Sequence, residues 1–467
     1  MQNSNKNPVY PYMPNTLPEV RQEMLDRVGI KSVDELFAHI PEEIRFGDKP
    51  LPLPERMASE QALSRYITGI LKKNKTCDDY ISFLGGGVAQ HYIPAVCDAM
   101  VQKGEFLTTF MGHYCVDSGK YQVWWEFQSL ICDLTGMEMM GWPAQEGATS
   151  SWSAILTAAR VNSGRKEAVV AGNIDPDKLR NIKEVCRAKL DIKVSKIDEK
   201  TGLVDMDDYL SLINENTAVV YFENPTFLGG IEDRGEEIAK YAHEKGAYVV
   251  VYVDPISLGL LETPKNYGAD VVCGELQSLG IRMQYGGGMS GFVATPYEDK
   301  WIVEYPFLAL SRYKTVEEGE FGYASMNYET VSYNKRENAG DVTSTCSALW
   351  SVAVARYLTL LGPDGLREVG ETMAYKAAYA KKKLGELDKV DILFDSKSLK
   401  EFTVNFDKSG KTVKEINEAL MERGIFGGHD LSEGFPQFGQ SALYCVTECR
   451  TKEEIDYLVE SLQEVLK

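Results

Sequence analysis

Three polar segments directly follow apolar runs whose composition is typical of buried β-strands. They are 223–225 (ENP), 254–255 (DP) and 274–280 (GELQSLG). In an open parallel sheet the carboxyl ends of the strands meet at one edge, and ligands bind there. Enzymes that use pyridoxal phosphate place a carboxylate there to hold the pyridinium N–H, and a lysine carries the Schiff base. Asp254 is placed to be that carboxylate.

The lysine that this chemistry needs is missing. Between Asp254 and Lys300 the only lysine is Lys265, which comes too early, in the turn-like segment TPKNYG. Gln277 stands where the lysine is expected. An amide cannot form an imine with an aldehyde, so we expect no catalytic residue and no covalently bound pyridoxal phosphate on this chain.

Small residues at 145–150 (QEGATS) begin a predicted helix ahead of the sheet. The free backbone N–H groups of such a helix start can bind an anion. Further along, the glycine run 286–288 permits close backbone approach, for phosphate or partner contact or simply for a turn. The weak candidates for a degenerate or shared cofactor site are Gly147, Ala148, Thr149, Asp254, Gly286 and Gly287.

Strands and helices that would position these residues alternate between about 80 and 300. The predicted strands are 168–171, 192–197, 218–222, 248–254 and 270–273, with helices at 205–213 and 234–244 between them. Alternation of this kind predicts βαβ units and a mostly parallel sheet covered on both faces, an α/β fold.

The rest of the chain predicts two further parts. Residues 1–78 contain eight of the 18 prolines and two short helical stretches, which favours an extended arm. We expect residues 79–330 to form the large domain and residues 331–467 to form a smaller α+β domain. The polar, tyrosine-rich segment 300–345 is interpreted as a linker or a loop on the substrate side.

Composition excludes several classes of protein. Of the 467 residues 44% are hydrophobic and 25% are charged, which is typical of globular proteins and excludes disorder of the whole chain. The net charge of −19 disfavours nucleic acid and anionic membranes as partners. Nine scattered cysteines without a CxxC motif predict reduced thiols. With no signal segment and no long apolar run, we expect a cytoplasmic protein.

Several long blocks in a fixed order resemble the alpha chain (subunit 1) of the two-subunit glycine dehydrogenase (decarboxylating), the P-protein of the glycine cleavage system. The resemblance covers nearly the whole chain. The blocks are 12–25 (YMPNTLPEVRQEML), 34–46, 82–96 (SFLGGGVAQHYIPAV), 124–137 (WWEFQSLICDLTGM), 222–233 (FENPTFLGGIED), 254–281, 285–295 (YGGGMSGFVAT), 360–369 and 446–456 (VTECRTKEEID).

The resemblance implies a fold-type-I pair of the pyridoxal-phosphate transferase kind. In that family the alpha chain has lost the lysine, and a homologous beta chain supplies it together with the cofactor at the alpha/beta interface. The pair decarboxylates glycine and passes the aminomethyl group to the lipoyl arm of the H-protein. Gln277 fits the family's lysine-free alpha pattern.

Departures from the family are concentrated in loops on the side of the cleft. They fall at 111–119 (MGHYCVDSG), 145–149, 304–308 and 336–349. Two alternatives to glycine decarboxylation therefore stay open. The same assembly acts on a different small amine or amino acid, or this chain is a non-catalytic scaffold that regulates its partner.

Six side chains are candidates for the shared cleft or the partner interface: His91, Tyr92, His113, Tyr114, Glu126 and Arg282. The first two match the family's His-Tyr pair, although a lone histidine before an apolar run is often structural. The histidine and cysteine in 113–115 are two candidate ligands without a third, which predicts no metal site. The alternatives for the glutamate and the arginine are a solvated helix face and a surface charge.

Overall fold

The computed structural model describes residues 9–10, 12–45, 52–54, 57, 59–107, 118–286, 289–326 and 347–467. The chain forms two units, Met1–Asn74 and Lys75–Lys467, each of which is described by itself. His113, Tyr114 and Gly287 therefore lie outside the described residues. The predicted domain boundary at 330 also falls outside them, and the three-part division stays a prediction.

The first unit contains two helices, as the sequence indicates. Helix α1 (Pro18–Val28) begins at a proline, whose fixed φ suits the first helical position, and ends at Gly29 with a φ of 80°. Helix α2 (Glu60–Leu71) is capped by Ser59, whose hydroxyl accepts a bond from the N–H of Ala62. Neither helix buries any of its residues.

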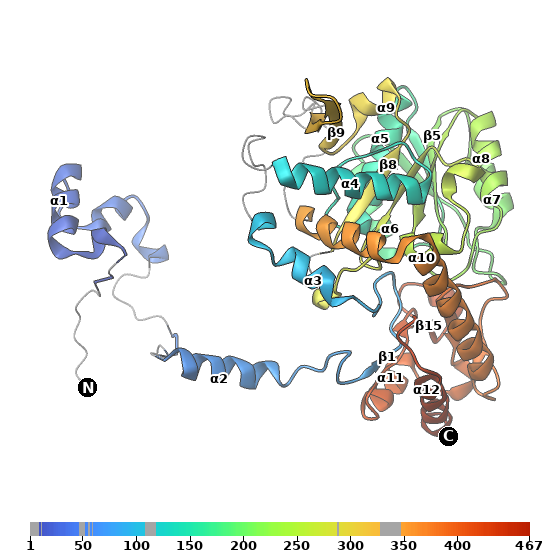
Figure 1. Cartoon of the computed structure of the whole chain (residues 1–467). Helices are drawn as coiled ribbons and strands as arrows, with labels where there is room; N and C mark the ends of the chain where they lie inside the picture. The colour runs from blue at the N-terminus through green and yellow to red at the C-terminus, as the bar shows by residue number, and fades with distance from the viewer. Residues whose placement is uncertain are drawn as a thin grey trace. The chain divides into compact units, whose positions relative to one another are not determined.

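The second unit contains a seven-stranded sheet with the order β2-β8-β7-β6-β5-β3-β4 (Figure 1). Neighbours among β3 to β7 pair in parallel, whereas β8 pairs antiparallel with β7 and with β2. The mostly parallel α/β architecture is confirmed. The strands are β2 (Met139–Met140), β3 (Glu167–Val170), β4 (Asp191–Val194), β5 (Thr217–Glu223), β6 (Tyr248–Val253), β7 (Val271–Glu275) and β8 (Gly291–Thr295).

Helices cover this sheet. Helix α5 packs against β5 to β8, and the long helix α10 packs against α3 and α4 (Figure 1). Helix α10 bends at Gly362, which has a φ of 61° and is followed by Pro363. The helices are α3 (Ala95–Val101), α4 (Ser118–Thr135), α5 (Gly147–Val161), α6 (Pro176–Cys186), α7 (Met206–Leu212), α8 (Gly235–Glu244), α9 (Asp299–Glu304) and α10 (Ala348–Leu384).

The C-terminal part forms a smaller α+β layer. An antiparallel sheet has the order β11-β12-β15-β14, and helices α11 (Val413–Met421) and α12 (Lys452–Val465) both begin with a capping box. A separate parallel pair joins β1 (Ile81–Ser82) to β13 (Ile425–Phe426). The four strands of the sheet are β11 (Asp391–Ile392), β12 (Glu401–Asn405), β14 (His429–Asp430) and β15 (Ser441–Cys445).

The interpretation of 300–345 as a linker or loop is wrong for the residues up to 326. Strands β9 (Ala309–Lys314) and β10 (Phe321–Met326) form an antiparallel hairpin after α9. Tyr305 is buried, and its hydroxyl bonds backbone groups of two other segments. Tyr305 thus anchors this segment to the sheet, because an aromatic ring with one polar atom can be buried once that atom is bonded.

Within the described residues, no helix combines the length and the apolar character needed to cross a membrane. All seven cysteines in the described part of the chain are free thiols.

We expect Gly229→Ala to destabilise the chain by about 2–4 kcal/mol. Gly229 has a φ of 92°, and a methyl group there would lie 2.4 Å from the carbonyl oxygen of Glu401 in β12. Chemical denaturation would measure the loss. Gly164→Ala is the matched control, because Gly164 has a φ of 110° but no atom near the added methyl group. Equal losses in the two variants would contradict a role for close packing at Gly229.

Candidate functional site

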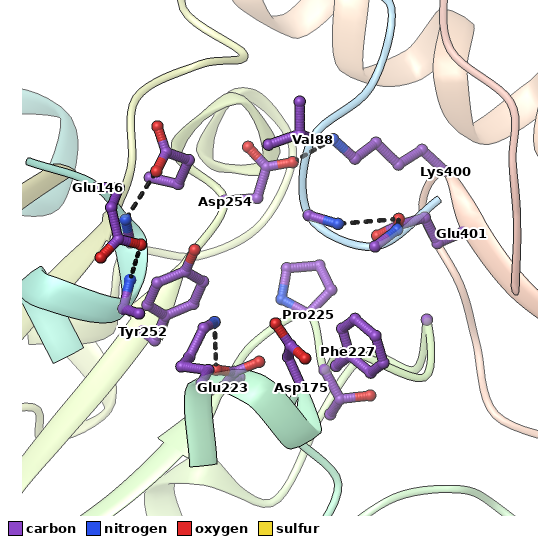
Figure 2. A pocket seen from close by; sticks show the side chains of 18 of the residues that line it. Val88, Glu146, Asp175, Glu223, Pro225, Phe227, Tyr252, Asp254, Lys400 and Glu401 are labelled. Carbon is purple, nitrogen blue, oxygen red and sulfur yellow. Dashed lines mark hydrogen bonds and ion pairs between the residues drawn. The ribbon is translucent and has the colours of Figure 1, made fainter. Parts of the chain in front are cut away.

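A cavity of about 230 Å³ lies where the carboxyl ends of β5, β6 and β7 meet (Figure 2). The parallel register brings the ends of these strands together, since Glu223 pairs with Tyr252 and Val253 pairs with Gly274. The other walls are the glycine loop at 86–88, the start of α5, and the start of β12. The charged side chains in its lining are Glu146, Asp175, Lys178, Glu223, Asp254, Glu275, Lys400 and Glu401.

The first turn of α5 was predicted to bind an anion, and the chain's own carboxylates occupy it. Glu146 accepts bonds from the N–H groups of Ala148 and Thr149 at 2.8 and 2.9 Å, and from the Thr149 hydroxyl at 2.8 Å. Glu275 accepts the N–H of Gly147 at 2.7 Å. All three predicted anion-binding N–H groups are therefore already bonded within the chain.

Glu275 is buried at the end of β7 beside this turn. Besides Gly147, the N–H groups of Leu276, Gln277 and Ser290 donate to it, each at 3.2 Å. Burial raises the pKa of Glu275 to about 8, and the charge of Glu146 acts in the same direction, although the backbone bonds oppose the shift. A further anion bound at this position would lie beside the carboxyl groups of Glu146 and Glu275.

Asp254 lies at the end of β6, where the sequence places the carboxylate that would hold a pyridinium N–H. Its Oδ1 accepts a bond from the hydroxyl of Ser278 at 2.7 Å, and its Oδ2 lies 2.6 Å from the ammonium of Lys400. Burial is the largest influence and opposes the ionisation of Asp254, but the charge of Lys400 and smaller favourable interactions, which include the Ser278 bond, together lower its pKa. The carboxylate is thus ionised and paired, but with an ammonium group of the same chain.

Lys400 also joins Asp254 to a buried chain of polar groups. Its Nζ lies 3.3 Å from Nε2 of His91, and the Nδ1 of His91 lies 2.9 Å from a carboxylate oxygen of Glu448. The second oxygen of Glu448 accepts the N–H of Tyr92 at 2.7 Å. These contacts suit the histidine tautomer that carries its proton on Nδ1. His91 therefore contacts Lys400, which lines the cavity, but does not line the cavity itself.

Replacing Glu448 by glutamine is expected to cost about 3 kcal/mol of stability at neutral pH. Burial opposes ionisation, yet the bonds from His91 and from the N–H of Tyr92 lower the pKa of Glu448 to about 2. Because the folded pKa lies below the unfolded value of 4.5, this contribution is present above pH ~4.5 and is lost as the pH falls toward 2.

Denaturation at a series of pH values would check this prediction. The parent chain should lose stability between about pH 5 and 2 more steeply than Glu448→Gln does. Glu386→Gln is the control, because Glu386 is exposed and its ion pair with Lys383 is screened by solvent. An equally steep loss in the Glu448 variant would contradict the assignment.

A second buried ion pair lies at the floor of the cavity. Lys178 of α6 lies 2.7 Å from Glu223, and its ammonium is 3.5 Å from the centre of the Tyr252 ring. The Tyr221 hydroxyl also donates to Glu223 at 2.9 Å. Burial raises the pKa of Glu223, and Lys178 opposes the shift. Both cavity lysines are therefore held by carboxylates, which leaves neither as a free amine.

Gln277 occupies the position expected of a Schiff-base lysine, and its amide is bonded to the main chain. Its Nε2 donates to the carbonyl of Ile281 at 2.9 Å, and its Oε1 accepts the N–H of Ala89 at 3.2 Å. The side chain is buried and is not part of the cavity's lining. The structure therefore offers an aldehyde no nucleophile at this position.

The remaining predicted residues divide into two groups. Gly147, Ala148, Asp254 and Gly286 line the cavity, whereas Thr149 contributes only through its bonds to Glu146. Three candidates do not line it: Tyr92, which is exposed; Glu126, which accepts a bond from Gln122; and Arg282, whose guanidinium lies 2.5 Å from Asp98. Among the described residues no cluster of three or more potential ligands could hold a metal ion.

Three residues of the site were not predicted from the sequence: Lys178, Lys400 and Glu448. Lys400 and Glu448 come from the C-terminal layer, far along the chain from Asp254 and His91, and no local pattern connects them. Glu146 was within the segment 145–150, but only the small residues were interpreted. A glutamate directly before Gly-Ala-Thr at a helix start is a signal for a capping carboxylate, and it could have been noticed.

The cavity does not fit pyridoxal phosphate. The carboxyl groups of Glu146 and Glu275 bond the helix start that would hold the phosphate. The ammonium of Lys400 pairs with Asp254, where the pyridinium N–H would lie. The amide of Gln277 stands in place of the lysine. No step of a reaction can therefore be assigned to a cofactor held by this chain.

Comparison with known proteins identifies the family. The sequence matches the family model described as "Glycine cleavage system P-protein" over residues 12–462. A "Probable glycine dehydrogenase (decarboxylating) subunit 1" from Staphylothermus marinus is 33% identical, with 98% of each chain covered. The protein of the same description from Brevibacillus brevis is 35% identical, over 98% of this chain and 99% of its own.

Solved structures agree with this result. A glycine decarboxylase (P-protein) of the glycine cleavage system in inhibitor-bound form superposes with a TM-score of 0.85 and 31% identity, over 98% of this chain and 100% of its own. A sphingosine-1-phosphate lyase from Burkholderia pseudomallei has a TM-score of 0.65 at 16% identity, which shows the fold alone. The predicted fold class, that of fold-type-I pyridoxal-phosphate transferases, is confirmed. The chain belongs to the glycine cleavage system P-protein family.

Proposed function

We propose that this chain is the alpha-type subunit of a glycine-decarboxylating P-protein and completes the active site of a beta-type partner. The partner carries pyridoxal phosphate and its Schiff-base lysine, and the pair transfers the aminomethyl group of glycine to the lipoyl arm of the H-protein. Relatives described as subunit 1 along nearly the whole chain support the assembly. In isolation, this chain is inactive.

One observation carries the proposal. A chain that holds pyridoxal phosphate as a Schiff base needs an amine for the aldehyde, and here Gln277 stands at the expected position with both ends of its amide bonded to the backbone. When bound to the complex, pyridoxal phosphate supplies an electron sink for loss of the carboxyl group. A chain without the amine can contribute to that chemistry only by shaping the cleft around a partner's cofactor.

The first unit is our candidate for holding the partner. Helix α2 exposes five large apolar side chains at helical spacing and buries none of its residues, as an unpartnered amphipathic helix does. A protein partner would cover this stripe and offset the entropy cost of ordering the arm. The stripe consists of Leu63, Tyr66, Ile67, Ile70 and Leu71.

Co-expression with the subunit 2 chain of the same genome tests the function. We expect the isolated chain to show no aldimine absorption, and the co-purified pair to be coloured and to catalyse glycine–bicarbonate exchange in the presence of lipoyl H-protein. The matched control is the partner alone, which should lack the full exchange rate. An exchange rate of the partner that does not change on addition of this chain would favour the scaffold alternative.

The substrate alternative rests on a separate observation. The sequence segments 111–119 and 336–349 depart from the family pattern, and they lie largely outside the described residues. A coloured pair that exchanges no glycine, but releases carbon dioxide or an amine from another small amino acid, would replace glycine as the substrate.

A further inference from the structure

The charges at the two ends of the cavity have the same signs as the charges of pyridoxal phosphate itself. At the start of α5, where the cofactor's phosphate would bind, the structure has the carboxyl groups of Glu146 and Glu275. Beside Asp254, where the pyridinium N–H would lie, it has the ammonium of Lys400. Figure 2 shows Glu146 and Lys400 on opposite sides of the cavity, with Asp254 between them.

We propose that Glu146, Glu275 and Lys400 are internal substitutes for the cofactor, and that they close a latent pyridoxal-phosphate site. The carboxyl groups take over the hydrogen bonds that a phosphate would accept from the helix start. The lysine takes over the ion pair that the pyridinium would make with Asp254. This inference rests on the proposed function only in assigning the working cofactor to the partner.

Energetics explain why such substitutes are needed. An empty cofactor site would leave three N–H groups at the start of α5 without acceptors and would leave Asp254 as an unpaired charge. The side-chain bonds satisfy both ends at once, so this subunit can fold without a ligand. Lys400 lies in the C-terminal layer and Asp254 in the large sheet, so their pair also ties the two parts together.

Binding of pyridoxal phosphate to the isolated chain tests the proposal. The phosphate-end variant is Glu146→Ser/Glu275→Gln, which keeps a capping hydroxyl and an amide oxygen but removes both carboxyl groups. The additional change Lys400→Met removes the ammonium that pairs with Asp254 and so leaves this carboxylate available to a pyridinium N–H. Equilibrium dialysis and the shift in melting temperature measure binding, with pyridoxal phosphate and inorganic phosphate as probes. Neither readout requires catalysis or the partner.

The parent chain is expected to bind neither probe. The phosphate-end variant should gain affinity for both probes. The additional Lys400→Met change should increase the affinity for pyridoxal phosphate about tenfold or more and leave the affinity for inorganic phosphate unchanged. The control is Glu236→Ser/Glu237→Gln, which removes two exposed carboxylates from the first turn of α8 and leaves the cavity closed. That control should bind like the parent.

Two outcomes would overturn the proposal. The first is binding of pyridoxal phosphate by the parent chain as tight as by the variants. The second is a phosphate-end variant that melts cooperatively and still binds neither probe. If the triple variant fails to fold, the phosphate-end variant alone decides. These readouts are independent of exchange by the complex, so failure of the proposed function would be seen separately.

Discussion

Replacing Lys400 by methionine is expected to reduce the free energy of unfolding by about 3 kcal/mol. The side chain of Lys400 is 6% exposed and that of Asp254 is 22% exposed, and their charged atoms lie 2.6 Å apart. Loss of the ammonium leaves Asp254 with a charge that only the Ser278 hydroxyl and one backbone N–H would still bind. Because Asp254 faces the cavity and is partly exposed, the loss of stability should lie at the lower end of the range for buried ion pairs.

The double variant Asp254→Asn/Lys400→Met separates the charge from the packing. Removing both partners eliminates the stranded carboxylate, so most of the lost stability should return. Urea denaturation of the parent chain, the two single variants and the double variant gives the coupling energy. The pair's contribution should persist at neutral pH and disappear in acid, as the pH falls through the lowered pKa of Asp254.

Lys408→Met is the matched control for this prediction. Lys408 also lies 2.6 Å from a carboxylate, that of Asp391, but the two side chains are 59% and 45% exposed. Water and salt screen such a pair, so we expect a loss of less than about 1 kcal/mol. If Lys400→Met and Lys408→Met cost the same, burial of the Asp254 pair would not be the source of its effect.

The sequence predicted those parts of the fold that local patterns determine. Alternation of apolar strands and amphipathic helices predicted the parallel sheet, and the strand ends placed Asp254 at the edge where the cavity lies. The absence of a lysine near Gln277 was also a local observation. Each of these inferences uses residues within one βαβ unit, where the chain's connectivity limits the possible arrangements.

The partners of the predicted residues could not be inferred in the same way. Asp254 pairs with Lys400 from the C-terminal layer, and His91 pairs with Glu448 across most of the length of the chain. A lysine in the C-terminal part predicts nothing by itself, because most lysines are solvated surface charges. Only the packing of the C-terminal layer on the large sheet brings these groups together, and the same packing converts a cofactor-like edge into a closed cavity.

The variant Ile67→Asp/Ile70→Asp, which places two charges on the apolar stripe of α2, is expected to abolish assembly with the beta-type partner. Ile67 and Ile70 are each 44% exposed and lie on one face with Leu63 and Tyr66. Removing two apolar side chains from an interface and placing two charges there should weaken binding by at least about 3 kcal/mol, or more than a hundredfold. Size-exclusion chromatography of the co-expressed pair and glycine exchange would measure the loss.

The matched control is Gln61→Asp/Thr68→Asp, which adds the same charge to the opposite face of the same helix. It should assemble and exchange like the parent, because that face carries no apolar stripe. The isolated Ile67→Asp/Ile70→Asp chain should also unfold at the parent's denaturant concentration, since α2 buries none of its residues. Normal assembly of the stripe variant would remove α2 from the interface, and other segments of the chain would then have to hold the partner.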